Sequence, residues 1–315
     1  MDAAITVSGL RKAYGSTTVL DGIDLQVAPG TVFSLLGPNG AGKTTIVNIL
    51  TTLIRADGGR AMVGGHDVAR EPDAVRASIG VTGQFSAVDK LLTGAENLAL
   101  MGDLHHLPRR EAARRAAALL ERFELADAGA KLAGTYSGGM VRRLDLAMSL
   151  IGEPRILFLD EPTTGLDPRS RRTMWQVVRD LAAGGVTVFL TTQYLDEADE
   201  LADRIVLLDR GRVVADGTPA ELKRLVPGGH ISLEFTNAAG LDAAASVLHA
   251  TVQDPDNLTL QVPSDGSVAS LKALLDRFDD ASISVERLSI HTPDLDDVFF
   301  ALTSHSAADE KVALS

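Results

Sequence analysis

The 315-residue chain is 45% hydrophobic and 23% charged, a balance that suits a globular protein with a real core. Its formal net charge of −12 disfavours binding to nucleic acid, which relies on clustered basic residues. It has no cysteine, which excludes disulfides, thiolate metal sites and cysteine nucleophiles, and no run approaches the ~20 apolar residues of a membrane-spanning helix, so we expect no membrane span.

Apolar, strand-like runs alternate with helical patterns from the N-terminus to about residue 215. The clearest runs are 32–36, 156–159 and 186–190. Such alternation favours an α/β fold with a largely parallel, buried sheet. Between about 85 and 150 the strand signal disappears, and segments rich in Ala, Leu and Arg, such as 109–122, predict helices. We therefore expect a helical subdomain over about 85–150, inserted into the α/β core.

Turn residues mark the end of this core. Two apolar runs, 205–208 and 213–215, flank a short glycine-containing turn and predict an antiparallel hairpin at the sheet edge. A helix over about 217–225 follows, and a Pro-Gly-Gly stretch then indicates a domain boundary. We predict an ATPase domain over 1–226, a small α+β accessory domain over 230–304 and a flexible tail over 305–315.

A glycine-rich phosphate loop follows the apolar run 32–36. It reads Gly37-Pro38-Asn39-Gly40-Ala41-Gly42-Lys43-Thr44 and fits G-x-x-x-x-G-K-[ST] in full. Glycines let backbone N–H groups face phosphate oxygens, Lys43 reaches the β and γ phosphates, and the Thr44 hydroxyl can hold Mg²⁺. Thr45 completes the predicted ATP site at the start of a helix. We therefore predict a P-loop ATPase (RecA-like) core that binds ATP and Mg²⁺.

Two neighbouring carboxylates follow the run 156–159. Asp160 suits the Mg²⁺ shell, as in other P-loop enzymes, and Glu161 is placed to activate the attacking water as a general base. The C-terminal ends of strands are where α/β sheets keep their ligands. An acidic surface turn is the other interpretation of an Asp-Glu pair, and the phosphate loop upstream makes it the weaker one.

A segment between these two motifs resembles the signature segment of ABC transporter ATPases. It reads Tyr136-Ser137-Gly138-Gly139-Met140 and is followed by Arg142 and Arg143. Ser137 can cap a helix, whose predicted apolar face carries Val141, Leu144, Met148 and Ile151. In the ABC family the signature of one subunit closes over the phosphate loop of another. The resemblance therefore implies a head-to-tail homodimer with ATP contacts in trans from Ser137, Gly138, Gly139 and Met140.

Further positions match the ABC family in order over about residues 4–225. The resemblance implies that Tyr14 stacks on adenine, although a strand-end tyrosine in the core is the alternative. It also implies that Gln84 touches Mg²⁺ and the attacking water and faces the membrane partner. Finally, Thr164-Gly165-Leu166-Asp167 resembles the family's dimer-interface loop, with Gly165, Leu166 and Asp167 at the interface.

One position departs from the family pattern. The stretch 191–198 fits the switch loop, but this chain has Gln193 where a histidine is usual. Glutamine can donate a hydrogen bond to the γ phosphate but carries no positive charge, so we expect weaker stabilisation of developing charge. Because Lys43, Asp160 and Glu161 are all present, we interpret this as an altered switch in an active enzyme.

The glutamine switch and the C-terminal ending resemble the daunorubicin-resistance type of drug exporter ATPase. The ending, 293–303, reads Pro-Asp-Leu-Asp-Asp-Val-Phe-Phe-Ala-Leu-Thr. The resemblance implies a separate transmembrane permease, a comparable C-terminal extension and a peripheral position on the cytoplasmic side of the cell membrane. One apolar helix face is predicted in this ending, and it packs either within the domain or against a second subunit; it consists of Leu295, Val298, Phe299 and Leu302.

The preferred function is ATP-driven efflux of a small amphipathic compound, and three alternatives compete with it. An importer ATPase would have the same catalytic core. A nucleic-acid or ribosome-associated ABC ATPase is disfavoured by the acidic balance, by the single cassette and by the short separation of Gly37 and Ser137, which leaves no room for a long coiled coil. A metabolic P-loop kinase has no role for the signature segment. Drug, lipid and polysaccharide all stay open as the transported compound.

Overall fold

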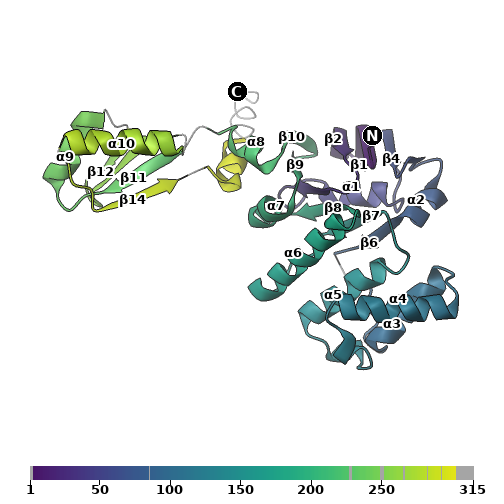
Figure 1. Ribbon diagram of the computed structural model, residues 1–315. Coiled ribbons are helices and arrows are strands. Elements are labelled where there is room, and N and C mark those ends of the chain that lie inside the picture. Colours follow the sequence, from purple (N-terminus) through teal and green to yellow (C-terminus); the bar gives the residue numbers. More distant parts are fainter. Residues whose placement is uncertain are drawn as a thin grey trace. The chain divides into compact units, whose positions relative to one another are not determined.

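The computed structural model describes residues 3–84, 86–226, 229–248, 252–264, 267–281, 283–291 and 293–302. The chain divides into two compact units, Met1–Pro219 and Ala220–Ser315 (Figure 1). The boundary predicted from the sequence lies a few residues further along and stays a prediction. The predicted tail lies outside the described residues.

A six-stranded sheet forms the centre of the first unit. Its order is β10–β9–β3–β8–β7–β6, with β3 at Val32–Leu36, β6 at Ile79–Thr82, β7 at Ile156–Asp160, β8 at Thr187–Thr192, β9 at Arg204–Asp209 and β10 at Arg212–Gly217. All neighbours are parallel except the β9–β10 hairpin. Every residue of β3, β7 and β8 is buried, which explains their continuous apolar runs. The predicted α/β fold is confirmed.

The two faces of this sheet belong to two hydrophobic cores. Phe33, Phe158 and Phe189 join the first core together with α1 (Lys43–Leu50) and α2 (Pro72–Ser78). Leu157 and Leu190 alternate with these phenylalanines and join the second core, which includes α5 (Gly138–Ser149), α6 (Pro168–Ala183) and α7 (Leu195–Leu201). Helices therefore cover both faces, as a parallel sheet requires.

A separate antiparallel sheet adds to the first core. Its order is β2–β1–β4–β5, with β1 at Ile5–Tyr14, β2 at Thr17–Val27, β4 at Gly58–Val63 and β5 at His66–Asp67. Alternate residues such as Ile5 and Val7 on β1, and Ile23 and Leu25 on β2, are buried in the same core as Phe33. The antiparallel pairing is therefore more extensive than the hairpin predicted from the sequence.

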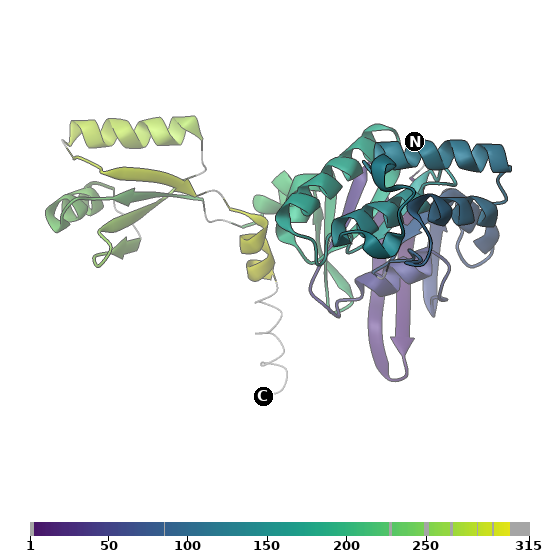
Figure 2. The ribbon, with the colours of Figure 1, turned by 90° about the horizontal axis from the view of Figure 1, so that it is seen from below.

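The stretch 86–150 consists of helices and loops. In α3 (Gly94–Leu104) a capping box joins Thr93 and Glu96, each accepting from the other's backbone N–H. α4 (Arg109–Arg122) buries one face, made of Ala112, Ala116, Leu119 and Leu120. Two short 3₁₀ turns, Ala126–Ala128 and Ala133–Thr135, lead into α5. These helices lie below the sheet in Figure 1 and therefore in front of it in Figure 2. The bounds predicted for this subdomain stay a prediction.

The second unit contains an antiparallel sheet with the order β12–β13–β11–β14. Its elements are β11 (His230–Glu234), α9 (Ala238–Leu248), β12 (Val252–Asp254), β13 (Thr259–Pro263), α10 (Val268–Asp280) and β14 (Arg287–His291), and α8 (Pro219–Lys223) precedes them. Leu233 and Leu260 of the sheet share one core with Leu241 of α9 and Phe278 of α10. Both helices therefore pack on the same face of this sheet.

The C-terminal helix predicted from the sequence is present. Residues 295–302 are helical, with Leu295 and Val298 buried and Phe299 and Leu302 half-buried. Packing within the chain therefore covers the first half of the predicted apolar face.

Phe189 is the centre of an aromatic cluster that holds three strands together. Its ring is fully buried and lies 5.1 Å from Phe33 and 5.3 Å from Phe158, measured between ring centroids. We expect Phe189→Ala to lower the free energy of unfolding by about 3–5 kcal/mol, measured by chemical denaturation. Leu104→Ala, at a side chain that is 64% exposed, should cost less than about 1 kcal/mol. Similar losses in the two variants would contradict this picture of the core.

Candidate active site

The phosphate loop runs from the end of β3 to the start of α1, and its backbone accepts only glycine at two points. A Cβ on Gly37 would lie 2.2 Å from the Leu208 carbonyl oxygen, and a Cβ on Gly42 would lie 2.7 Å from Leu20 Cδ2. Gly42 also has a φ of 109° and caps α1. The loop thus brings its N–H groups and a helix N-terminus to one place, which suits an anion.

Lys43 is buried in this loop. Its side chain is 4% exposed, and Nζ donates to the carbonyl oxygens of Gly37 at 2.8 Å and Pro38 at 3.1 Å. Nζ also lies 3.6 Å from Glu161 Oε1. Burial lowers the pKa of Lys43, and the Glu161 carboxylate opposes this shift. The structure therefore brings together the predicted phosphate ligand and the predicted general base.

The neighbouring strand β8 binds the Asp160 carboxylate and the backbone of Glu161. The Thr191 hydroxyl donates to Asp160 Oδ1, and the Glu161 N–H donates to both the carbonyl and the hydroxyl oxygen of Thr191, each at 3.1 Å. The Thr164 hydroxyl donates to Glu161 Oε2 at 3.3 Å. Glu161 has a φ of 49°, which is unfavourable for a residue with a Cβ. Strain of this kind is held in place by surrounding contacts and occurs at functional sites.

The remaining loops of the predicted site follow other strands of the two sheets. Gln193 follows β8 and is half-buried, whereas Gln84 follows β6 and is exposed. Because β3, β8, β7 and β6 are parallel neighbours, these loops meet the phosphate loop at one edge of the sheet. Tyr14 ends β1 and is 51% exposed, with Lys12 Nζ 5.5 Å from its ring centroid.

The signature and interface loops both begin helices with a side-chain cap. Ser137 Oγ accepts the Met140 N–H at 3.3 Å at the start of α5, and Asp167 accepts two backbone N–H groups at the start of α6. Hydrogen bonds from Ser170 and the backbone lower the pKa of Asp167. Ser137 and Gly138 are exposed. One cavity of about 420 Å³ is lined in part by Gln84, Gly138, Glu161, Gly165 and Leu166.

Sequence reasoning placed Thr191 in the switch loop and Arg142 after the signature segment but gave neither residue a role. Arg142 lies on α5 and pairs with Asp145 at 3.1 Å, and both side chains are buried. The four residues of the apolar face predicted for this helix all join or pack against the second core, but α5 is buried on several sides and ends at Ser149, before Ile151. The sequence did contain one signal for the role of Arg142. Arg142 and Asp145 are opposite charges three positions apart on a helix expected to pack in the core, which indicates a buried ion pair.

The oxygen donors of the site fit a magnesium ion bound to a nucleotide. Thr44 is exposed at the start of α1, and the Asp160 carboxylate lies at the end of β7. Hydroxyl and carboxylate oxygens are ligands that Mg²⁺ prefers. The glycine positions of the loop leave the space that a close phosphate needs.

Comparison with known proteins agrees with this geometry. The family model described as ABC transporter matches residues 20–164. The daunorubicin resistance ATP-binding protein DrrA3 of Streptomyces coeruleorubidus is 53% identical over 304 residues, covering 96% of this chain and 96% of that protein. The chain belongs to the ABC transporter ATP-binding proteins of the daunorubicin-resistance type. The resemblance stated from the sequence is thus confirmed, and the protein is an ABC transporter ATPase, coupled to transport.

Other ABC proteins are similar over a large share of the chain. The linearmycin resistance ATP-binding protein LnrL of Bacillus subtilis (strain 168) is 35% identical, covering 97% of this chain and 100% of that protein. A dimeric structure of a post-hydrolysis state of an ATP-binding cassette, bound to ADP and Pi, matches with a TM-score of 0.62 and 26% identity, covering 68% of this chain and 98% of that chain. ABC ATPase subunits dimerise and work with permease partners. Among the described residues, none of the helices has the length and apolar character that crossing a membrane requires.

Thr191→Val removes the hydroxyl that binds both carboxylate residues of this ABC site and keeps the side-chain volume. A hydrogen bond to a charged group contributes about 1.5–3 kcal/mol, so we expect ATP hydrolysis about ten- to a hundredfold slower, with ATP binding retained. Steady-state ATPase and nucleotide-binding assays measure both.

Thr187→Val is the matched control on the same strand. It removes a hydrogen bond to the Gly30 N–H at the other end of β8 and should leave the hydrolysis rate unchanged. An equal loss of rate in the two variants would show that Thr191 acts only through stability.

Proposed function

We propose that this chain hydrolyses ATP to drive efflux of a small amphipathic antibiotic or drug through a separate membrane permease. The observation that carries the proposal is the 3.6 Å approach of Lys43 Nζ to Glu161 Oε1. This approach combines a cation for phosphate and a carboxylate for water in one buried site, and hydrolysis needs both.

Each residue of the site has a separate role. Lys43 holds the β and γ phosphates within the glycine loop, and Gln193 donates a hydrogen bond to the γ phosphate. Glu161 accepts a proton from the attacking water, whose oxygen bonds to the γ phosphorus as the bond to the β–γ bridging oxygen breaks, which yields ADP and phosphate. Thr44, Asp160 and Gln84 would hold Mg²⁺, and the ion would supply positive charge against the phosphate oxygens.

Two copies of the chain complete each other's site in a head-to-tail homodimer. Ser137 and Gly138 are exposed at the start of α5, where helix N–H groups can meet the γ phosphate of a second copy. Gly165 is exposed in the loop before α6 and faces the same interface, and the exposed ring of Tyr14 stacks on adenine. ATP closes this dimer, and loss of the γ phosphate opens it.

The permease contacts the chain beside the loop that follows β6 and contains Gln84, here called the Gln84 loop. This contact holds the chain on the cytoplasmic side of the cell membrane. Leu91 is 85% exposed and Leu132 is 50% exposed. They lie on neighbouring segments, because the Ala133 N–H donates to the Leu92 carbonyl at 2.8 Å. Grouped, exposed apolar side chains favour a protein partner.

The proposed substrate class rests on resistance proteins that are similar over nearly the whole chain, among them DrrA3 and LnrL. They are named for resistance to daunorubicin and to linearmycin. Export of a lipid or polysaccharide, or import, is the alternative, and it would leave the ATPase site unchanged.

Glu161→Gln should abolish ATP hydrolysis while keeping ATP binding, because the amide keeps the shape of the side chain and cannot accept the proton. ATP should then accumulate in a dimer, which light scattering of the purified variant detects with Mg-ATP and not without it. Lys43→Ala should instead lose ATP binding. Substantial residual turnover in Glu161→Gln would refute Glu161 as the base.

Leu91→Asp should weaken binding to the permease by at least about tenfold, because a charge cannot be buried without a partner. Co-purification of the two subunits and resistance of cells that express both of them measure the effect. Leu53→Asp is the control, since Leu53 is 69% exposed after the end of α1 and lies outside the proposed contact. Unchanged co-purification of Leu91→Asp would place the permease contact elsewhere.

A further inference from the structure

One arginine on the signature helix contacts the backbone on both sides of Glu161. Arg142 is 9% exposed; its Nε donates to the Pro162 carbonyl at 2.8 Å and its Nη2 to the Asp160 carbonyl at 3.3 Å. Glu161 lies between these two carbonyls, with its unfavourable φ of 49°. The two hydrogen bonds therefore oppose relaxation of the backbone that carries the carboxylate.

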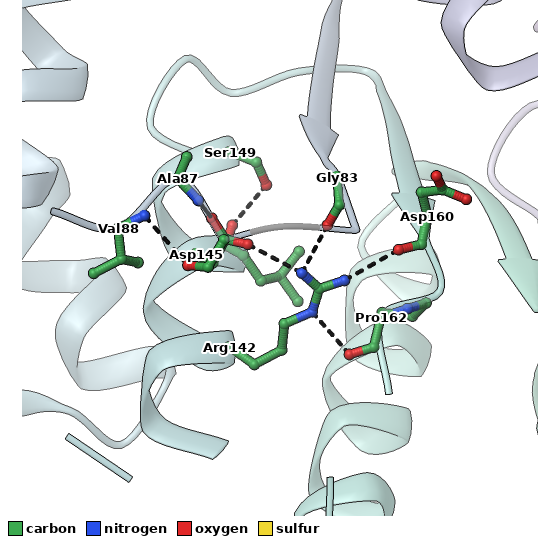
Figure 3. Close-up of polar contacts among 10 residues, drawn as sticks. Gly83, Ala87, Val88, Arg142, Asp145, Ser149, Asp160 and Pro162 are labelled. Carbon is green, nitrogen blue, oxygen red and sulfur yellow. Dashed lines mark hydrogen bonds and ion pairs between the residues drawn. The ribbon is translucent and has the colours of Figure 1, made fainter. Parts of the chain in front are cut away.

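The same guanidinium reaches the Gln84 loop. Its Nη1 donates to the Gly83 carbonyl at 2.9 Å and to Asp145 Oδ2 at 3.1 Å (Figure 3). Asp145 Oδ1 in turn accepts the Ala87 N–H at 3.0 Å. The Arg142–Asp145 pair thus binds the loop both before and after Gln84.

Burial makes the two members of this pair depend on each other. It lowers the pKa of Arg142 and raises the pKa of Asp145, and in each case the charge of the partner opposes the shift. Removing one partner leaves a buried charge without compensation. The planar guanidinium of an arginine can donate hydrogen bonds to three carbonyls in different directions, which a lysine ammonium does less well.

We propose that Arg142, held by Asp145, is a positioning residue that fixes the Glu161 carboxylate and the Gln84 loop in one arrangement. This inference rests on the proposed function, in which Glu161 is the base and the Gln84 loop faces the permease. A displacement of the loop moves the Gly83 carbonyl. The hydrogen bonds of the Arg142 guanidinium transmit this movement to the backbone on both sides of Glu161. Hydrolysis is then fast only when the loop is in place.

The test compares Arg142→Gln and Asp145→Asn with Arg115→Gln in the full chain. Arg115 is a matched control, because it donates to the Ile151 carbonyl and pairs with Glu153, away from the site residues. We expect kcat to fall at least about tenfold in Arg142→Gln, with the KM for Mg-ATP and the Kd for ADP within about threefold of the parent. Arg142→Lys should recover part of the rate, and Arg115→Gln should keep it.

Two further measurements separate positioning from general stability. Trypsin should cleave after the exposed Lys90 faster in Arg142→Gln than in Arg115→Gln, because the loop has lost its anchor. In the Glu161→Gln background, adding Arg142→Gln should leave the ATP-dependent dimer intact, since Arg142 acts on Glu161 rather than on ATP. Loss of the dimer, or unchanged cleavage after Lys90, would overturn the inference.

The outcomes also distinguish this inference from the proposed function. Hydrolysis that persists in Glu161→Gln alone would overturn the proposed function, whatever Arg142→Gln does. A parent-like kcat in both Arg142→Gln and Asp145→Asn, with Glu161→Gln inactive, would overturn only the positioning role. If circular dichroism shows that Arg142→Gln is unfolded, the kcat values of Arg142→Lys and Asp145→Asn are compared with that of Arg115→Gln instead.

Discussion

The buried approach of Lys43 to Glu161 is the constraint on which the nucleotide site depends. A buried ammonium needs acceptors, and Lys43 finds them in two loop carbonyls and this carboxylate. The two residues follow β3 and β7, which are separated by β8. The Gly37 N–H donates to the Thr192 carbonyl at 3.3 Å, and Thr191 holds Asp160. β8 therefore sets the spacing across which the lysine meets the carboxylate.

Site residues could be predicted from the sequence where one short segment holds all of them. The phosphate loop and the Asp160–Glu161 pair were predictable because strand, loop and helix follow one another directly along the chain. The parallel sheet was predictable because strands buried on both faces have continuous apolar runs. The type of ABC protein followed from Gln193 and the C-terminal ending.

The contacts that hold these segments against each other could not be predicted in the same way. Thr191 is a buried strand residue that matters because it binds Asp160 on the neighbouring strand. The order of strands in a sheet cannot be read from local periodicity. The antiparallel β2–β1–β4–β5 sheet joins two local pairs, β1–β2 and β4–β5, through the pairing of β1 with β4, which are far apart along the chain. The charge spacing on α5 could point to a pair with Asp145, but the other contacts of Arg142 could not be predicted, because its three carbonyl partners lie at or just after the ends of other strands.

Helix α5 connects three parts of the proposed mechanism. It begins at the exposed signature, packs against β6 and α6, and carries the pair that binds the Gln84 loop. A Cβ on Gly139 would lie 2.7 Å from Ser170 Oγ, so the start of α5 also lies close to the start of α6 and its Asp167 cap. In the proposed mechanism, this one helix therefore faces the second copy, the loop that contacts the permease and the carboxylate of the proposed base.

The proposed hydrolysis requires that Lys43 and Glu161 act on the same phosphate. The most direct measurement is a structure of the parent chain with magnesium and a non-hydrolysable ATP analogue. We expect the γ phosphate within hydrogen-bond distance of Lys43, with a water between it and the Glu161 carboxylate. An analogue bound away from Lys43, or a Glu161 side chain turned away from the γ phosphate, would contradict these roles of Lys43 and Glu161.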